Sequence, residues 1–245
     1  MKIETVNAVI TTSYKALFFV FGTIGNVLFV HLVYKRRQLR SRSSILQCCQ
    51  CVFHFFCQAG TVLDGLFTIN QRMTREECFT HISFYIFFQS AQLIIMLVIM
   101  IDILVLVRFP LFYKSIRSHT YFVATIVPTL LYSFSIVLFG YLTTNEDPVT
   151  SCSPPLAFSL ETSLIVKYLI LTLSTLTLFI FLILIRIFHR KGRAQKNDDS
   201  FRIVKRLQFS VVIFVFTWYF SQIVAYIYLQ TDRSEVWKRM LFSHN

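Results

Sequence analysis

Residues 81–108 read HISFYIFFQSAQLIIMLVIMIDILVLVR, and this stretch decides the fold. A helix needs about 20 mainly apolar residues to cross the hydrocarbon core of a bilayer. The stretch is longer than that, and its only charged residues are Asp102 and the terminal Arg108. Since backbone polar groups cannot go unpaired in lipid, such a segment crosses a membrane as an α-helix. We therefore predict a membrane protein.

Five other segments are also apolar and long enough to cross the bilayer. Apolar and polar residues do not alternate along them, as they would in the strands of a transmembrane β-barrel. The prediction is an all-α protein, a polytopic transmembrane helix bundle that forms one domain over residues 1–245. The six spanning helices are expected at residues 15–34, 44–68, 81–108, 121–142, 163–188 and 207–230.

Composition agrees with a membrane protein. Hydrophobic residues make up 55% of the 245 residues and charged residues 15%, whereas a soluble domain carries about 25% charged residues. The net charge of +12 does not indicate a nucleic-acid partner, because Lys and Arg lie in short loops between apolar segments.

The basic loops predict the orientation, because cytoplasmic loops carry an excess of Lys and Arg. Five follow the first helix in KRRQLRSR, and eight lie between the fifth and sixth helices, in and around the polar segment 189–202. The loops at 69–80 and 143–162 carry no such excess. We expect the N-terminus and a short tail at 231–245 to lie outside, and segment 189–202 to be a cytoplasmic loop.

Sequence motifs of enzymes are absent. The chain has no phosphate-binding G-x-x-x-x-G-K-[ST], no H-E-x-x-H and no G-x-S-x-G. Cys48 and Cys51 form a C-x-x-C, but it lies in an apolar helix and no second pair accompanies it. We predict no enzymatic activity, no cofactor and no metal site.

Several motifs occur in a fixed order along the chain. Asn26 completes a Gly-Asn pair in the first helix, His54 lies in the second, and Asp102 precedes Pro110 and Tyr113 of a Pro-Leu-x-Tyr string. This order resembles rhodopsin-like G-protein-coupled receptors, where Asp-Arg-Tyr precedes Pro-Leu-x-Tyr. Here the triplet is Asp-Ile-Leu, so the Asp is kept and the Arg is absent. His54 stands where that family usually carries an Asp.

The resemblance continues outside these motifs. Phe214 and Trp218 are similar to the family's Phe-x-x-x-Trp-x-Pro, with Phe220 in place of the Pro. Cys78, just before the third helix, and Cys152 match the family's disulfide, so the resemblance implies this bond; two free thiols are the alternative. Over about residues 15–230 the chain is similar to one nematode class in particular, the serpentine receptor class sx. The strings GNVLFVHLVYKRRQLRSRSSILQCCQCVFHFF and CFTHISFYIFFQSAQLIIMLVIMIDILVLVRFPLFY carry this likeness.

The resemblance implies a seven-helix chemosensory receptor that binds an external small molecule or peptide and activates a heterotrimeric G protein. Asp102 would be a switch residue near the cytoplasmic interface, within reach of Arg108 or Lys114, or an interfacial charge that only fixes helix depth. Phe214 and Trp218 would be the toggle, a pair of aromatic residues beneath the ligand that transmits its binding to helix six. The alternative is that they only pack against other aromatic side chains.

Two polar residues of the first helices have structural alternatives. Asn26 is expected to hydrogen-bond across helices one and two. His54 is expected to be buried and satisfied by a neighbour, with a pH-sensitive role as the alternative. Ligand pockets lie between helices, and five polar residues in the outer or middle parts of the helices are candidates to face one: Asp64, Gln89, Gln92, Lys167 and Gln222.

Alternatives to a signalling receptor remain. The sequence has no Asn-Pro-x-x-Tyr and no seventh apolar segment, which favours a truncated, non-signalling six-helix product as one alternative. A transporter or channel is another, although repeated halves are absent. The expected location is the plasma membrane, with sensory cilia as one candidate. The expected partners are the ligand, the G protein and the bilayer, and assembly with other receptor chains stays open.

Overall fold

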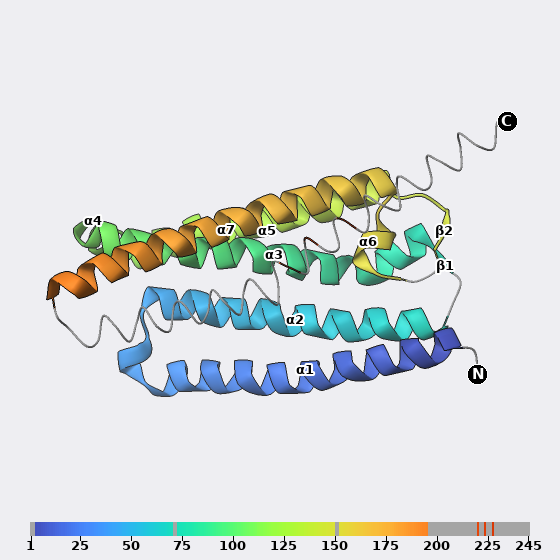
Figure 1. Cartoon of the computed structure of the whole chain (residues 1–245), viewed down its shortest axis with the longest axis horizontal. Coiled ribbons are helices and arrows are strands. Elements are labelled where there is room, and N and C mark those ends of the chain that lie inside the picture. The colour runs from blue at the N-terminus through green and yellow to red at the C-terminus, as the bar shows by residue number, and fades with distance from the viewer. Residues whose placement is uncertain are drawn as a thin grey trace. The chain divides into compact units, whose positions relative to one another are not determined.

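The computed structural model describes residues 3–70, 73–149 and 152–195, together with Phe220, Ile223 and Ile227. This part is almost entirely helical (Figure 1), so the all-α prediction is confirmed. Most of the expected sixth span at 207–230 lies outside the described residues, as do residues 196–202 and the tail 231–245. Five helices of the described part are long and apolar enough to cross a membrane, at Val9–Lys35, Arg42–Phe67, Arg75–Arg108, Ser118–Thr143 and Leu160–Arg190.

The helices extend beyond the apolar segments, and short elements connect them. The long helices are α1 (Ile3–Lys35), α2 (Arg42–Asn70), α3 (Arg75–Arg108), α5 (Ser118–Thr143) and α7 (Leu160–Gln195). The short elements are the 3-10 turn η1 (Arg37–Leu39), α4 (Pro110–Ser115), α6 (Pro154–Ala157), β1 (Met73–Thr74) and β2 (Pro148–Val149).

Capping residues explain why α3 begins at Arg75, six residues before the expected span. The Thr74 hydroxyl accepts a hydrogen bond from the Glu77 N–H at 3.2 Å, and the Glu77 carboxylate accepts one from the Thr74 N–H at 3.0 Å. This reciprocal capping box satisfies two backbone donors at a helix start. Cys78, which we expected just before the helix, therefore lies in its first turn.

α7 also extends beyond the apolar segment that predicted it. α7 continues to Gln195, so residues 189–195, which we expected in a loop, are helical. Apolar length reports the thickness of the hydrocarbon layer, whereas a helix continues into water for as long as its backbone bonds are satisfied.

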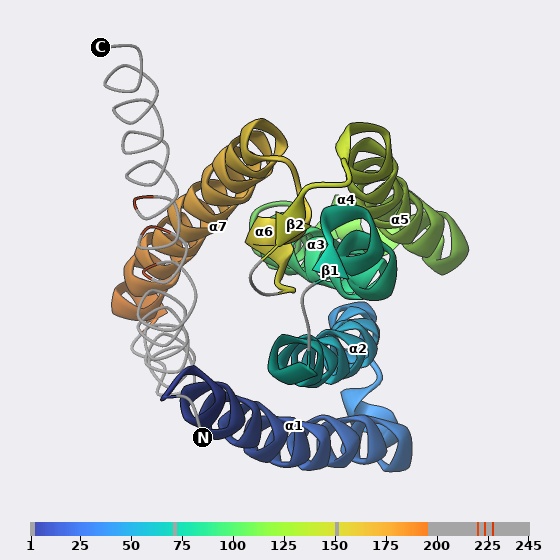
Figure 2. The ribbon, with the colours of Figure 1, turned by 90° about the vertical axis from the view of Figure 1, so that its right-hand side faces the viewer.

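The described residues group into two compact units. The first comprises Met1–Ile99 and Leu111–Ser163, and the second comprises Met100–Pro110 and Leu164–Asn245. In the first unit, α1, α2, α3 and α5 are successive neighbours, as Figure 2 shows in a view from the helix ends. The described part of the second unit consists mainly of the last turns of α3 and nearly all of α7.

Small residues bring α1 and α2 close together in the first unit. A Cβ at Gly65 would lie 2.7 Å from the Thr12 hydroxyl oxygen, and a Cβ at Gly22 would overlap the Gln58 amide. Close approach at small residues is the usual source of helix association in membranes. α2 meets α3 through aromatic side chains, since the Phe56 and Phe88 rings are stacked with centroids 4.6 Å apart.

Candidate functional site

A disulfide joins Cys78 of α3 to Cys152 in the α5–α6 connection, as the resemblance implied. Their Cα atoms are 5.4 Å apart, and both side chains are buried. β1 pairs antiparallel with β2 next to this bond, and the Arg75 N–H donates to the Asp147 carbonyl at 2.9 Å. The connection is therefore fastened to the start of α3 at several points.

An aromatic cluster supports this end of the first unit. Phe79, which is fully buried, packs edge-on against Tyr141 at 4.9 Å and Phe158 at 5.3 Å between ring centroids. Gly140 lies beneath it, and a Cβ there would overlap the Phe79 ring. Edge-to-face pairs of this kind add about 0.5–1.5 kcal/mol beyond the area that they bury. The residue after Cys78 thus anchors α3, α5 and the loop together.

An ion pair connects α1 and α2 in the half of the bundle near the disulfide. Lys15 Nζ lies 2.7 Å from Asp64 Oδ2, and only 7% of the Asp64 side chain is exposed against 30% for Lys15. We expected Asp64 to face a pocket, but we assigned no role to Lys15. A lysine at the edge of an apolar span usually extends to the interface, so the sequence carried only a weak signal for this pair.

Polar groups of α3 lie near the same part of α2. Tyr85 packs over Gly60, where a Cβ would lie 2.5 Å from the Tyr85 Cβ. Gly60 is one helical turn from Asp64, and Tyr85, Gln89 and Gln92 are spaced to share one face of α3. Gln92 Oε1 is buried and has no hydrogen-bond partner among the described residues. A buried orphan amide costs about 1–3 kcal/mol, so this face can accept a polar ligand group or water.

Asn26 and His54 form the hydrogen bond that we expected between the first two helices. Asn26 Nδ2 lies 3.2 Å from His54 Nδ1, and both side chains are partly buried. Since an amide N–H can only donate, Nδ1 accepts and the neutral ring carries its proton on Nε2. The pair occupies the middle of α1 and α2, away from both helix ends.

Arg42 makes the main polar contact at the end of the first unit opposite the disulfide. Its guanidinium donates to the Tyr113 carbonyl at 2.7 Å and to the Ile116 carbonyl at 2.6 Å. It also lies over the rings of Tyr113, at 5.3 Å, and Tyr121, at 5.8 Å. Tyr113 lies in α4, the helix that Pro110 begins, and Ile116 directly follows its last residue, Ser115. The sequence located the Pro-Leu-x-Tyr string but not its arginine partner.

The remaining predicted residues fall in the second unit or outside the described residues. Asp102 is buried, with 4% of its surface exposed, and it lies in the last part of α3. Lys167 is half-buried on α7. Phe214, Trp218 and Gln222 lie outside the described residues. Among the residues that are described, no group of three His, Cys, Asp or Glu side chains could hold a metal ion.

Comparison with known proteins assigns the family. No curated protein matches the chain. One family model, described as "Serpentine type 7TM GPCR chemoreceptor Srsx", matches residues 19–245. This match covers most of the chain and agrees with the apolar spans and the Cys78–Cys152 disulfide. The protein therefore belongs to the Srsx family of serpentine, seven-transmembrane GPCR chemoreceptors.

Proposed function

We propose that this protein is a chemosensory receptor that binds an external small molecule or peptide and activates a heterotrimeric G protein. The observation that carries the proposal is the match of residues 19–245 to a chemoreceptor family. Signalling requires that the ligand bind the active arrangement of helices better than the resting one. The proposal involves no covalent chemistry.

The ligand-facing groups are expected in the half of the bundle near the disulfide. Asp64 and Lys15 place a carboxylate and an ammonium group side by side there, and Gln89 and Gln92 lie on the face of α3 that also carries Tyr85. The orphaned Gln92 oxygen supports a polar ligand group at this wall. Lys167, which belongs to the second unit, and Gln222, which lies outside the described residues, stay candidates from the sequence alone.

The signalling residues are expected on the cytoplasmic side of the membrane. Asp102 is buried near the end of α3, where a carboxylate is costly and is by default a functional candidate. Tyr113 lies in α4, the short helix that Arg42 contacts, and we assign this helix to the G-protein surface. Phe214 and Trp218 keep their proposed toggle role.

The disulfide supports the proposed orientation. Disulfides form and persist in oxidising compartments, so Cys78 and Cys152 belong on the outer side. α1 and α2 then place the basic segment KRRQLRSR on the cytoplasmic side. We propose a multi-pass protein of the plasma membrane with its N-terminus outside, and sensory cilia as the first location to examine. Assembly with other receptor chains is compatible with this arrangement.

Basal nucleotide exchange tests the proposal without a known ligand. The full chain is expressed in cells, and GTPγS binding to a panel of Gα subunits is measured in membranes at matched surface expression. We expect exchange above that of membranes lacking the receptor. Asp102→Asn should change it at least twofold, because it removes the buried charge, whereas Glu146→Gln in an exposed loop should not.

Two results would overturn parts of the proposal. If the surface-expressed chain raises exchange on none of the Gα subunits, G-protein activation is wrong. If exchange occurs but Asp102→Asn equals Glu146→Gln, Asp102 is not the switch.

A further inference from the structure

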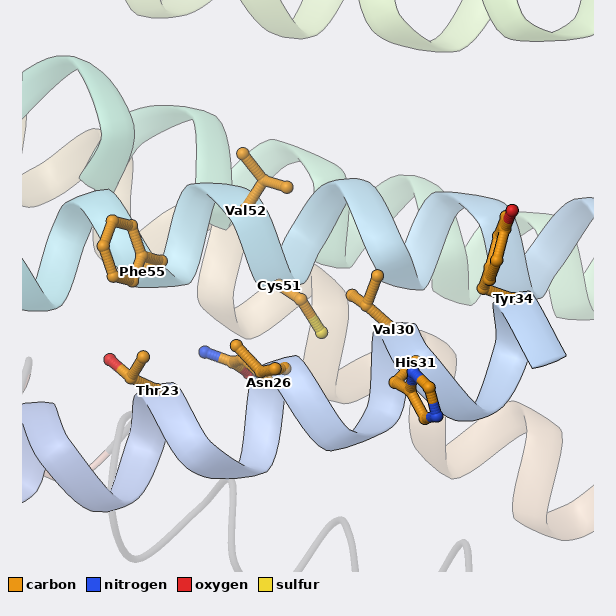
Figure 3. Close-up of a pocket in the computed structure, with 9 residues that line it drawn as sticks. Thr23, Asn26, Val30, His31, Tyr34, Cys51, Val52 and Phe55 are labelled. Atoms are coloured by element: carbon orange, nitrogen blue, oxygen red, sulfur yellow. The ribbon is translucent and has the colours of Figure 1, made fainter.

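A groove runs between α1 and α2 in the first unit (Figure 3). It encloses about 510 Å³, a volume within the range of small-molecule sites. Figure 3 shows the Cys51 sulfur pointing from α2 toward α1 across this space, with Thr23, Val30 and Tyr34 along the α1 side. The lining is mostly apolar, and the amide of Asn26 is occupied by its bond to His54.

The groove has the length and surface that an acyl chain requires. From Thr23 to Tyr34 it extends about 16 Å along α1, at a helical rise of ~1.5 Å per residue. Half of a hydrocarbon core of ~30 Å is about 15 Å. Val27 is 60% exposed and Val52 is 50% exposed, so these walls are open to whatever surrounds the helices. The length of the groove along α1 therefore matches the hydrocarbon thickness of one leaflet.

The basic end of the groove is organised by Arg40. Its guanidinium lies over the Tyr34 ring at 5.4 Å and donates to the Tyr34 carbonyl. An arginine has five N–H donors in a planar fork, so this contact positions the group and leaves further donors for an anion. Lys35, Arg36 and Arg37 are exposed beside it. The apolar groove thus ends at the Arg40 guanidinium, which the Tyr34 contact positions and which three other basic side chains surround.

We propose that this groove binds an anionic phospholipid of the cytoplasmic leaflet. One acyl chain lies against Val27, Val30, Val52 and Phe55, and the headgroup phosphate accepts hydrogen bonds from Arg40. Phosphate and guanidinium form paired, charge-assisted hydrogen bonds, and the basic segment attracts anionic lipid to the mouth of the groove. The bound lipid would hold α1 against α2.

Native mass spectrometry of the purified full chain tests the site. The probes are phosphatidylserine and phosphatidylcholine with identical acyl chains, each titrated into the detergent-solubilised protein. Removing any one Lys or Arg near a membrane surface weakens anionic-lipid binding about fivefold. We expect Arg36→Gln to stay within that loss and Arg40→Gln to exceed tenfold. Val30→Trp, which fills the groove, should abolish retention of the lipid.

Arg36→Gln is the matched control, because it removes the same charge from the same segment and leaves the Tyr34 contact intact. A single, monodisperse species by size exclusion shows that each variant is folded. Equal losses for Arg36→Gln and Arg40→Gln would overturn the contact of the phosphate with Arg40. Equal retention of the two lipids would overturn the preference for an anionic lipid. Unchanged binding by Val30→Trp would overturn the groove. A dimer that Val30→Trp dissociates would assign the groove to a second copy of the chain.

Discussion

Replacement of Arg42 by Ala should release α4 from the first unit. α4 has six residues, and a helix this short is not stable in isolation. The Tyr113 carbonyl, in its last turn, and the Ile116 carbonyl, directly after it, accept the two Arg42 hydrogen bonds of 2.7 and 2.6 Å. The helix therefore depends on a tertiary contact, and Arg42 supplies the polar part of it.

The magnitude follows from these contacts. Hydrogen bonds from a charged donor contribute about 1.5–3 kcal/mol each, and an exposed cation–π contact adds about 0.5–1 kcal/mol. Ordering an arginine side chain costs up to about 2 kcal/mol, and contributions from one side chain are not additive. We expect Arg42→Ala to destabilise α4 by about 2–4 kcal/mol. Since 1.4 kcal/mol is about tenfold, local opening should rise at least tenfold.

Hydrogen–deuterium exchange measures this opening directly. The amides of residues 111–121 should exchange at least tenfold faster in Arg42→Ala, while those of α2 beyond its first turn should not change. Arg42→Lys keeps the charge but loses the planar fork, so its effect should be intermediate. Arg36→Ala removes an exposed arginine nearby and should match the wild type. Exchange at 111–121 that is equal in Arg42→Ala and Arg36→Ala would refute the reasoning.

Two further predictions concern the end of the bundle that carries the disulfide. Lys15→Ala leaves the buried Asp64 carboxylate without its 2.7 Å partner and should cost about 3–5 kcal/mol, whereas the double variant Lys15→Met/Asp64→Leu should recover most of this loss. Thermal unfolding in detergent distinguishes them, and a double variant as unstable as the single one would contradict the pairing. Cys152→Ser removes the disulfide between residues 74 positions apart and should lower the free energy of unfolding by about 2–4 kcal/mol. Its melting temperature should equal that of the reduced wild type, and an unchanged melting temperature would show that the bond does not stabilise the fold.

Apolar length alone decided the fold class. Residues 81–108 could only be a membrane helix, because lipid leaves the backbone no other hydrogen-bond partners. The start of α3 was also encoded locally, in the capping pair Thr74 and Glu77, although span length alone placed it near residue 81. The disulfide between Cys78 and Cys152 came from family resemblance, since spacing by itself does not select a cysteine partner.

Side-chain partners were decided only by the tertiary structure. In water, a polar and an apolar face reveal how a helix is rotated about its axis, but in a bilayer both the lipid-facing and the protein-facing sides are apolar. The sequence therefore showed that Asp64 is a polar residue within a span and that Tyr113 follows one. It did not show the direction in which either side chain points. Packing at small residues such as Gly65 set the rotation of α1 against α2, and that rotation brought Lys15 to Asp64. The contact of Arg42 with Tyr113 joins segments 71 positions apart, and only folding brings them together.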